Sequence, residues 1–162
     1  MTRRAACRKA DARSPGATDT IPQAQVRIVR HVALILVVEP DADSRRRILA
    51  SLRALGHTAF GRENGRLALD LLSRRPGFDV VIARFTLPKM SGTDFLRAVA
   101  MTVPSASGVL IADARYAPRK HRRPEDQWIT ILPRALSMED LELAVENALE
   151  VRRSRGREAV RP

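Results

Sequence analysis

The chain has 162 residues, of which 44% are apolar, and a formal net charge of +11 at pH 7. This length and composition favour one globular domain with terminal extensions over two domains. The only cysteine, Cys7, lies in a polar, arginine-rich stretch, which excludes a disulfide framework and a cysteine-based metal site. We therefore expect a reducing, cytoplasmic setting.

The positive charge is concentrated at the two ends of the chain. Residues 1–31 contain 7 Lys and Arg against 2 Asp and Glu, residues 151–162 contain 5 against 1, and residues 32–150 contain 17 against 15. We predict a disordered basic N-terminal arm (1–31), a nearly neutral folded domain (32–150) and a basic C-terminal tail (151–162). The net charge alone is therefore no evidence that the folded part binds nucleic acid.

The longest apolar run near the start is VALILVV, residues 32–38. A membrane helix needs about 20 such residues, and a signal peptide needs a small-residue cleavage site after its apolar core. Here Glu39, Pro40 and Asp41 follow at once, so the run is predicted to be a buried strand. Residues 1–30 share an arginine-rich, acid-poor composition with organellar transit peptides, but they show no clear amphipathic period.

The first half of the predicted domain alternates strand and helix. A helix capped by Asp41 or Asp43 follows the first strand and ends at Gly56. A second strand (57–60), a turn (61–65) and a second helix (66–75) come next, and Pro76-Gly77 ends that helix. The inward positions of the two helices are Ile48, Leu49, Leu52, Leu55, Leu67, Leu71 and Leu72.

The second half continues the alternation with one interruption. Strands are predicted at 79–83, 108–112 and 128–132, and a helix at 93–100 carries Phe95, Leu96 and Val99 inward. Ser137 and Asp140 resemble a capping box for the last helix. The apolar stripe of that helix is Met138, Leu141, Val145 and Leu149. Residues 115–127 contain Pro118, Pro124 and many basic side chains, so a fourth helix is predicted to be lost or reduced to a turn.

These elements predict the fold class. Strands so continuous in Val, Ile and Leu are covered on both faces, which indicates an α/β fold: a doubly wound, five-stranded parallel sheet between two helix layers, of flavodoxin-like type.

Four segments resemble the receiver domain of bacterial response regulators. Residues 34–60 are similar to its first strand, first helix and second strand, and residues 79–99 to its third strand and phosphorylation loop, with Leu-Pro-x-Met-x-Gly at 87–92 as the most specific part. Residues 109–115 and 129–145 are similar to its two later signature strands. The resemblance covers residues 32 to about 150 and implies a receiver fold.

The resemblance also implies a set of functional positions, and this chain departs from the family at each. Receivers hold Mg²⁺ on an acidic pair after the first strand, phosphorylate an aspartate that ends the third, and place a Ser/Thr after the fourth and a lysine after the fifth. The corresponding residues here are Glu39-Pro40, Arg84, Asp113 and Leu132, with Asp41 close by. Arginine has no oxygen to phosphorylate. We therefore expect a degenerate, pseudo-receiver site with no catalysis, no metal and no cofactor.

The charges expected at the carboxyl ends of the strands lead to a hypothesis for Arg84. Carboxylates of Glu39, Asp113 and Asp41 gathered at the strand ends would repel one another unless a cation joined them. We expect Arg84 to bond to both Glu39 and Asp113 and to hold the domain in one conformation; a solvated arginine over a decayed pocket is the alternative. In the family, an aromatic residue on the fifth strand moves on phosphorylation. The corresponding position here is Ile129, with Trp128 beside it.

Other candidate residues are weaker. His31, His57 and His121 share no motif, so no histidine metal site is expected. A partner or polyanion surface is predicted at Arg119, Lys120, Arg122, Arg123 and Trp128, with a solvated loop as the alternative. The last helix carries Glu139, Glu142, Glu146 and Glu150 on its outer side.

The expected function is therefore a stand-alone atypical receiver in bacterial two-component or phosphorelay signalling, not an enzyme, acting by phosphorylation-independent contact with protein partners. The alternative is weak, nonspecific nucleic-acid or polyanion binding through the basic arms and residues 115–127. A third interpretation, phosphorylation at Asp79 or Asp41, has the least support. No membrane association is expected, and the sequence indicates neither the partner nor the oligomeric state.

Overall fold

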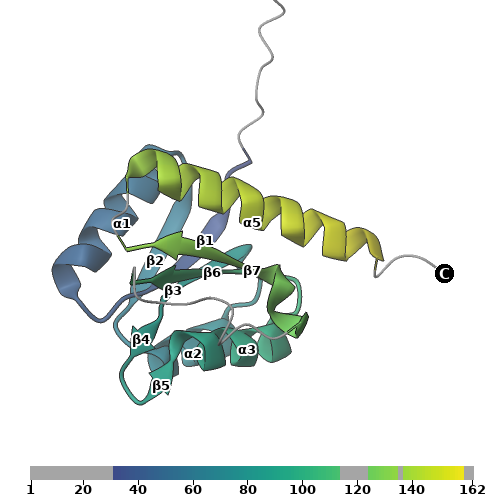
Figure 1. Cartoon of the computed structure of the whole chain (residues 1–162), viewed down its shortest axis with the longest axis horizontal. Helices are drawn as coiled ribbons and strands as arrows, with labels where there is room; N and C mark the ends of the chain where they lie inside the picture. Colours follow the sequence, from purple (N-terminus) through teal and green to yellow (C-terminus); the bar gives the residue numbers. More distant parts are fainter. Residues whose placement is uncertain (1–30, 114–123, 135–136, 159–162) are drawn as a thin grey trace, which may run out of the picture.

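The computed structural model describes residues 31–113, 124–134 and 137–158. Its centre is a parallel five-stranded sheet with strand order β2-β1-β3-β6-β7 (Figure 1). The strands are β1 (Leu34–Val38), β2 (Thr58–Arg62), β3 (Val80–Arg84), β6 (Ser107–Ala112) and β7 (Ile129–Pro133). The predicted α/β, flavodoxin-like class is confirmed.

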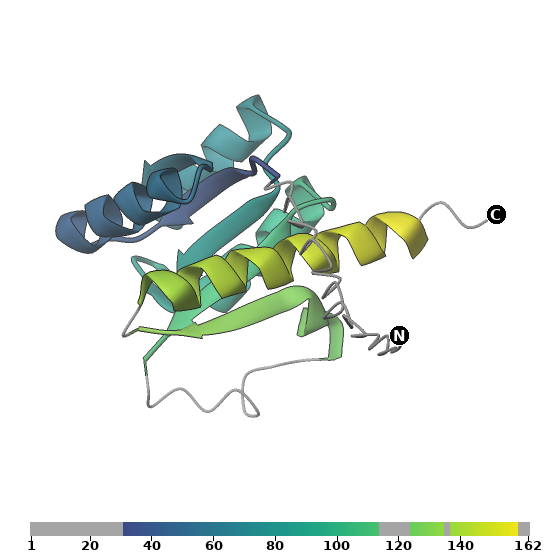
Figure 2. The same ribbon diagram turned by 90° about the horizontal axis from the view of Figure 1, so that it is seen from above.

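Helices cover both faces of this sheet. They are α1 (Ala42–Ala54), α2 (Gly65–Arg74), α3 (Gly92–Thr102) and α5 (Met138–Glu158). Helices α1 and α5 contact one another on one face, the face seen from above in Figure 2, and α2 and α3 contact one another on the other face (Figure 1). The chain runs from β1 to β2 on one side and then to β3 on the other. The sheet therefore has its topological switch point between β1 and β3.

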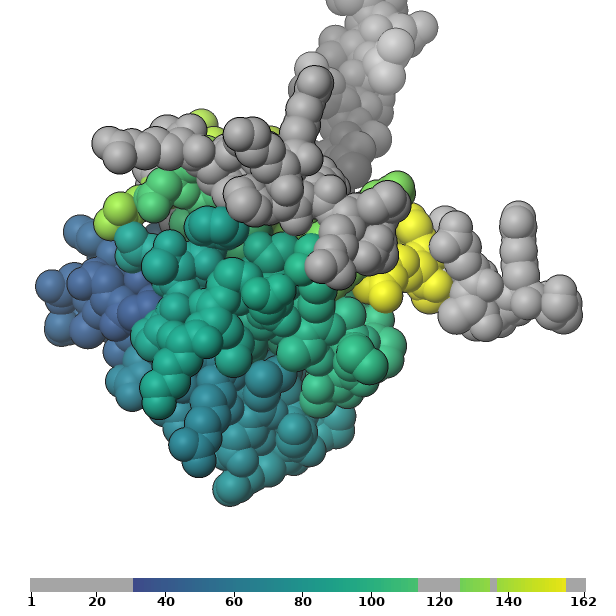
Figure 3. Space-filling view, turned by 60° about the horizontal axis from the view of Figure 1, so that its bottom comes forward, coloured from purple at the N-terminus to yellow at the C-terminus, as the bar shows by residue number. Residues whose placement is uncertain are grey.

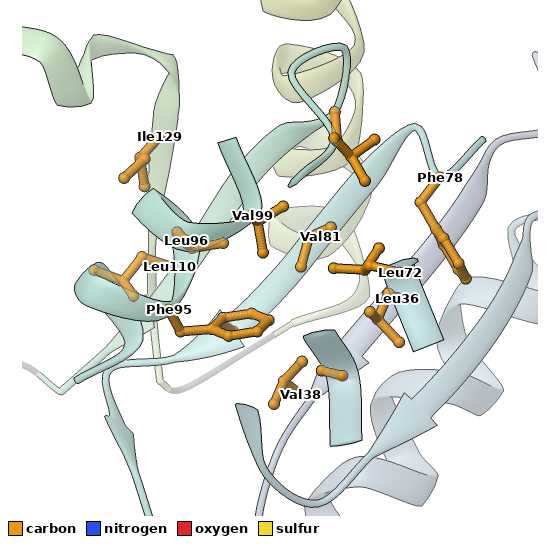
Figure 4. Packing of buried hydrophobic residues seen from close by; sticks show 14 of the residues in the cluster. Leu36, Val38, Leu72, Phe78, Val81, Phe95, Leu96, Val99, Leu110 and Ile129 are labelled. Carbon is orange, nitrogen blue, oxygen red and sulfur yellow. The ribbon is translucent and has the colours of Figure 1, made fainter. Parts of the chain in front are cut away.

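Alternate residues of each strand enter two separate apolar clusters. On the α2–α3 side, Leu36, Val81 and Leu72 point toward one another (Figure 4). On the α1–α5 side, Ile35 and Ile82 pack with Leu52. Because strand side chains alternate between faces, a strand buried on both sides must be apolar throughout, which is what the sequence pattern indicated.

The connection between β6 and β7 contains a short 3-10 helix, η1 (Pro124–Trp128), in its described part. Residues 115–123, the rest of the segment in which a fourth helix was predicted to be lost or reduced to a turn, lie outside the described residues. The η1 turn is held to α3 by Arg97, whose Nε and Nη2 donate to Asp126 at 3.1 and 2.6 Å. The Asp126 side chain is buried, and this hydrogen-bonded pairing raises the pKa of Arg97.

Several predicted boundaries and side-chain environments need correction. Strand β2 extends to Arg62, into the segment predicted as a turn. Helix α5 continues to Glu158, so the predicted tail 151–162 begins too early. Leu67 and Met138, predicted to face inward, are 43% and 45% exposed. Both lie in the first turn of a helix.

A small antiparallel hairpin of β4 (Thr86–Leu87) and β5 (Met90–Ser91) follows β3 and was not predicted. Pro88 and Lys89 form its turn, and Lys89 has a φ of 67°, as the second central residue of a type II turn requires. After the hairpin, the chain lies next to the end of β3 again. There the N–H of Gly92 donates to the carbonyl of Phe85 at 2.6 Å. Gly92 lies so close to the carbonyl oxygen of Arg84 that a β-carbon would overlap it.

Replacing Gly92 with Ala is expected to lower the free energy of unfolding by about 2–4 kcal/mol, because the added methyl group would have to displace backbone rather than a flexible side chain. Gly156→Ala is the matched control, since Gly156 is also helical and no heavy atom lies within 4 Å of its β-carbon position. That control should be neutral or stabilise by up to about 1 kcal/mol. Urea unfolding of both variants tests this, and a Gly92→Ala protein as stable as wild type would contradict it.

Candidate functional site

The candidate site lies at the carboxyl edge of the sheet, where strands β1, β3, β6 and β7 end side by side. Glu39 follows β1, Arg84 is the last residue of β3, and Asp113 follows β6. Because these strands are parallel and adjacent, the residues at their ends come together. Glu39 and Arg84 are placed at the β1–β3 switch point, where open α/β sheets bind ligands.

Arg84 and Glu39 form a largely buried ion pair. Nη1 of Arg84 donates to Oε1 of Glu39 at 2.9 Å, and the two side chains are only 18% and 4% exposed. The same Glu39 oxygen accepts the backbone N–H of Asp41 at 3.0 Å. The carboxylate therefore has both a cation and an N–H donor, which a buried charge requires.

The Asp113 half of the expected clamp is not formed. No hydrogen bond or ion pair joins Arg84 to Asp113 within the described part of the chain. The Asp113 carboxylate instead accepts from Nη1 of Arg134 at 3.2 Å, in a pair that is 60% and 46% exposed. Arg134 directly follows β7, the neighbour of β6, and its N–H bonds to the carbonyl of Ala112, so it is held next to Asp113.

The remaining predicted positions have structural contacts of other kinds. Asp41 is the N-cap of α1, where its Oδ1 accepts the N–H of Ser44 at 2.7 Å, and Pro40 is half-buried before it. Hydrogen bonds from the Ser44 side chain and backbone hold the pKa of Asp41 below its ordinary value. Leu132 is buried in the α1–α5 cluster. Ile129 is buried in the cluster on the opposite face.

A cavity of about 640 Å³ opens beside the ion pair. We call it the α1–α5 cavity, because α1 and the start of α5 form its walls. Its lining residues are Glu39, Ser44, Arg47, Ile48, Ala50, Ser51, Arg84, Ile111, Arg134, Ser137, Met138 and Leu141. Sequence reasoning missed Arg47 and Arg134; the position of Arg134 just after the last strand was the available signal.

The histidines do not form a site among the described residues. His31 is exposed, His57 accepts the N–H of Ala33 at 3.3 Å through its Nδ1, and His121 lies outside the described ranges. Within residues 31–113, 124–134 and 137–158, no three His, Cys, Asp or Glu side chains are grouped so that they could hold a metal ion.

The structure describes only part of the predicted basic surface. Arg119, Lys120, Arg122 and Arg123 lie outside the described residues. Trp128, predicted as part of that surface, is instead buried at 8% exposure, with the Arg155 guanidinium 5.5 Å from its ring centroid. The glycine at position 108 leaves room for the indole, since a β-carbon there would meet the ring at 2.7 Å.

Comparison with known proteins identifies the fold. The chain matches no protein-family model and no curated protein. Among solved structures, it is similar to a response regulator receiver domain protein from Clostridium thermocellum (22% identity, TM-score 0.66, covering 74% of this chain and 95% of that one). It is also similar to the signal receiver domain of an HD domain-containing protein from Pseudomonas fluorescens Pf-5 (26%, 0.67, 76% and 98%).

An adenylate cyclase structure from Rhodopirellula baltica is similar as well (16% identity, TM-score 0.71, covering 79% of this chain and 95% of that one). These likenesses show that the chain has the fold of a response regulator receiver domain. Among the described residues, no helix is both long enough and apolar enough to cross a bilayer.

Arg84→Ala is expected to lower the free energy of unfolding by about 1–3 kcal/mol, because it leaves the buried Glu39 carboxylate without its cation. Arg134→Ala is the control: it breaks an exposed pair at the same edge and should cost less than about 1 kcal/mol. Chemical unfolding at neutral pH measures both. Equal, small effects would mean that the Arg84–Glu39 pair does not stabilise the domain.

The cap of α1 should contribute a pH-dependent part of the stability. Since the folded-state pKa of Asp41 lies below the ordinary value of 3.8, its contribution is fully present above pH 3.8 and is lost as the pH falls through the folded-state pKa. Asp41→Asn keeps an N-cap acceptor but cannot titrate. Its unfolding free energy should therefore fall less between neutral and acidic pH than that of wild type, and an unchanged pH profile would contradict this assignment.

Proposed function

We propose that this chain is a receiver-type signalling module of the degenerate kind, which receives no phosphoryl group and acts through contact with a protein partner. The observation that supports this best is the Arg84–Glu39 ion pair at the end of β3, the position at which receivers carry their phosphoacceptor. The fold and the likeness to receiver domains support a role in signal transduction. Nothing in this assignment requires catalysis.

The chemistry at the edge opposes phosphoryl transfer. A guanidinium has no nucleophilic oxygen and stays charged, so it cannot replace an aspartate. Its fixed charge also pairs with Glu39, the residue that corresponds to the metal-binding carboxylates of receivers, so a metal ion there would meet a cation already bound to that carboxylate. Leu132, at the place of the lysine, is buried in an apolar cluster and offers no cation for a phosphoryl group.

Two other carboxylates were considered as acceptors, and their contacts argue against both. Asp79 precedes β3 at the opposite, amino edge of the sheet, where it accepts the N–H of Leu34 at 2.8 Å and pairs with Arg152 at 3.1 Å. Asp41 caps α1. Each carboxylate therefore has a structural role that phosphorylation would disrupt.

For the partner surface we propose the outer side of α5 together with residues 115–127. Glu139 and Glu146 are exposed on this helix, and Leu143 between them is 58% exposed. An apolar side chain flanked by acidic groups suits a partner with a complementary apolar and basic patch. The nucleic-acid alternative is less favoured, because Arg152, Arg153 and Arg155 all contact groups of their own domain.

Incubation with acetyl phosphate and Mg²⁺ tests the central claim. We expect the intact mass to stay unchanged, because the carboxyl edge lacks an acceptor. Mass is the chosen readout because it responds to a covalent phosphoryl group and ignores reversible binding. An adduct mapped to Asp41, Asp79 or Asp113 would refute the proposal, and the corresponding Asp→Asn variant would confirm the site. As a handling control, Arg46→Gln should also remain unmodified.

A further inference from the structure

We propose that the α1–α5 cavity is a reversible binding site for a small organic anion with an apolar body, such as an aryl carboxylate or an aryl phosphate monoester. The inference rests on the proposed function in one respect, because an edge that formed an acyl phosphate would use this space for its own chemistry. It goes further by giving the edge a ligand of its own.

The charged groups of the cavity predict a negatively charged ligand. Among the described residues, three guanidinium groups line the cavity, those of Arg47, Arg84 and Arg134, against one lining carboxylate, Glu39. Two further carboxylates act on these arginines from outside the lining: Asp113 pairs with Arg134, and Asp41 attracts Arg47 and Arg84. On the cavity wall itself the arginines still outnumber the carboxylate, so an anion placed between them would be attracted to all three.

Unused hydrogen-bond donors give the ligand its binding groups. A guanidinium has five N–H donors. Within the described residues, the side chain of Arg84 donates only to Glu39, that of Arg134 only to Asp113, and that of Arg47 only to the Ser44 hydroxyl, at 3.4 Å. The remaining donors can serve a carboxylate or phosphate, whose geometry a planar guanidinium fits with two parallel bonds.

Position within the cavity ranks the three arginines. Arg84 is 18% exposed, so an anion beside it would interact in a poorly hydrated environment, where charges act more strongly. Arg134 is 60% exposed and stands at the rim with Arg47. The N-terminus of α5 adds little, because Ser137 and Asp140 already satisfy each other as a capping box.

The apolar residues of the cavity wall predict that the ligand also has an apolar part. Ile48, Ile111, Met138 and Leu141 line the same space. The 45% exposure of Met138 would be reduced by a ligand that covers it. The volume of about 640 Å³ lies within the range of roughly 300–1,000 Å³ that is typical of small-molecule sites. Inorganic phosphate, which lacks an apolar body, should therefore bind more weakly than an aryl phosphate.

NMR titration of the full chain with benzoate and with phenyl phosphate tests the proposal. We expect saturable, reversible shifts at Arg47, Arg84 and Met138 that weaken when the salt concentration is raised about tenfold. Benzamide, which has the shape of benzoate without its charge, should bind roughly tenfold more weakly or not at all. The absence of saturable shifts with both anions, or equal binding of benzoate and benzamide, would overturn the inference.

Variants connect the binding to the arginines. Arg47→Gln and Arg134→Gln should each weaken benzoate binding roughly fivefold, and together they should weaken it roughly 25-fold. Both change exposed side chains, so the domain should remain folded. Arg46→Gln is the matched control on α1, since Arg46 is exposed, pairs with Asp43 and does not line the cavity. Equal losses in the control, or unchanged binding in the double variant, would contradict the site.

The two proposals fail separately. A covalent phosphoryl adduct would refute the proposed function, whatever benzoate does. A failure of benzoate and phenyl phosphate to bind, with no adduct from acetyl phosphate, would remove only the cavity as a ligand site and leave the degenerate receiver intact.

Discussion

The carboxyl edge of this domain depends on the pairing of one buried carboxylate with one buried cation. Parallel strands deliver whatever follows them to the same edge, and β1 delivers Glu39 into a position that is almost inaccessible to water. An ionised carboxylate there is unfavourable unless a cation and hydrogen-bond donors accompany it. Arg84, at the end of the adjacent strand, and the N–H of Asp41 meet that requirement. Removing either charge alone would leave the other one buried without a partner.

Close backbone packing fixes this arrangement. Arg84 is the last residue of β3, and its carbonyl oxygen lies against Gly92 at the start of α3. The intervening hairpin is closed by a turn at Pro88-Lys89. The Arg84 side chain therefore extends from a backbone segment held on two sides, by the sheet and by α3. A rigid support of this kind suits a permanent ion pair better than a group that must move during a switch.

Arginine is used repeatedly as an internal tie in this protein. Arg97 holds η1 to α3 through Asp126, Arg152 holds the far half of α5 to Asp79, and Arg155 covers Trp128. In each case a planar, permanently charged group with a long apolar stem joins elements that are distant in sequence. The end of α5 extends beyond the sheet (Figure 1), and its yellow surface lies at the edge of the molecule in Figure 3; these contacts attach it. Much of the charge in this segment is therefore structural.

These ties explain what the sequence could and could not predict. The strands were recognisable because burial on both faces demands uninterrupted Val, Ile and Leu, and the Arg84–Glu39 pairing followed from parallel strand ends. The extension of α5 to Glu158 was missed because residues 151–158 are rich in arginine, which is typical of a solvated tail, although Arg152 and Arg155 contact the rest of the domain. The Arg134–Asp113 pair and the burial of Trp128 depend on side-chain packing between β7 and its neighbours. The α1–α5 cavity also depends on packing between elements, so no local sequence pattern predicts it.

A permanent cation changes how such a module can be regulated. In receivers, the resemblance implies, a phosphoryl group alters the charge at the end of the third strand and the domain responds. A guanidinium group has no oxygen that could be phosphorylated, so phosphorylation cannot change the charge that Arg84 places at that point. Under the proposed function, a change in state must therefore come from a molecule that binds reversibly to the edge or to α5. An anion in the α1–α5 cavity would contact Arg84 and Met138 together, and so would couple the buried pair to the first turn of α5, the helix that we propose as the partner surface.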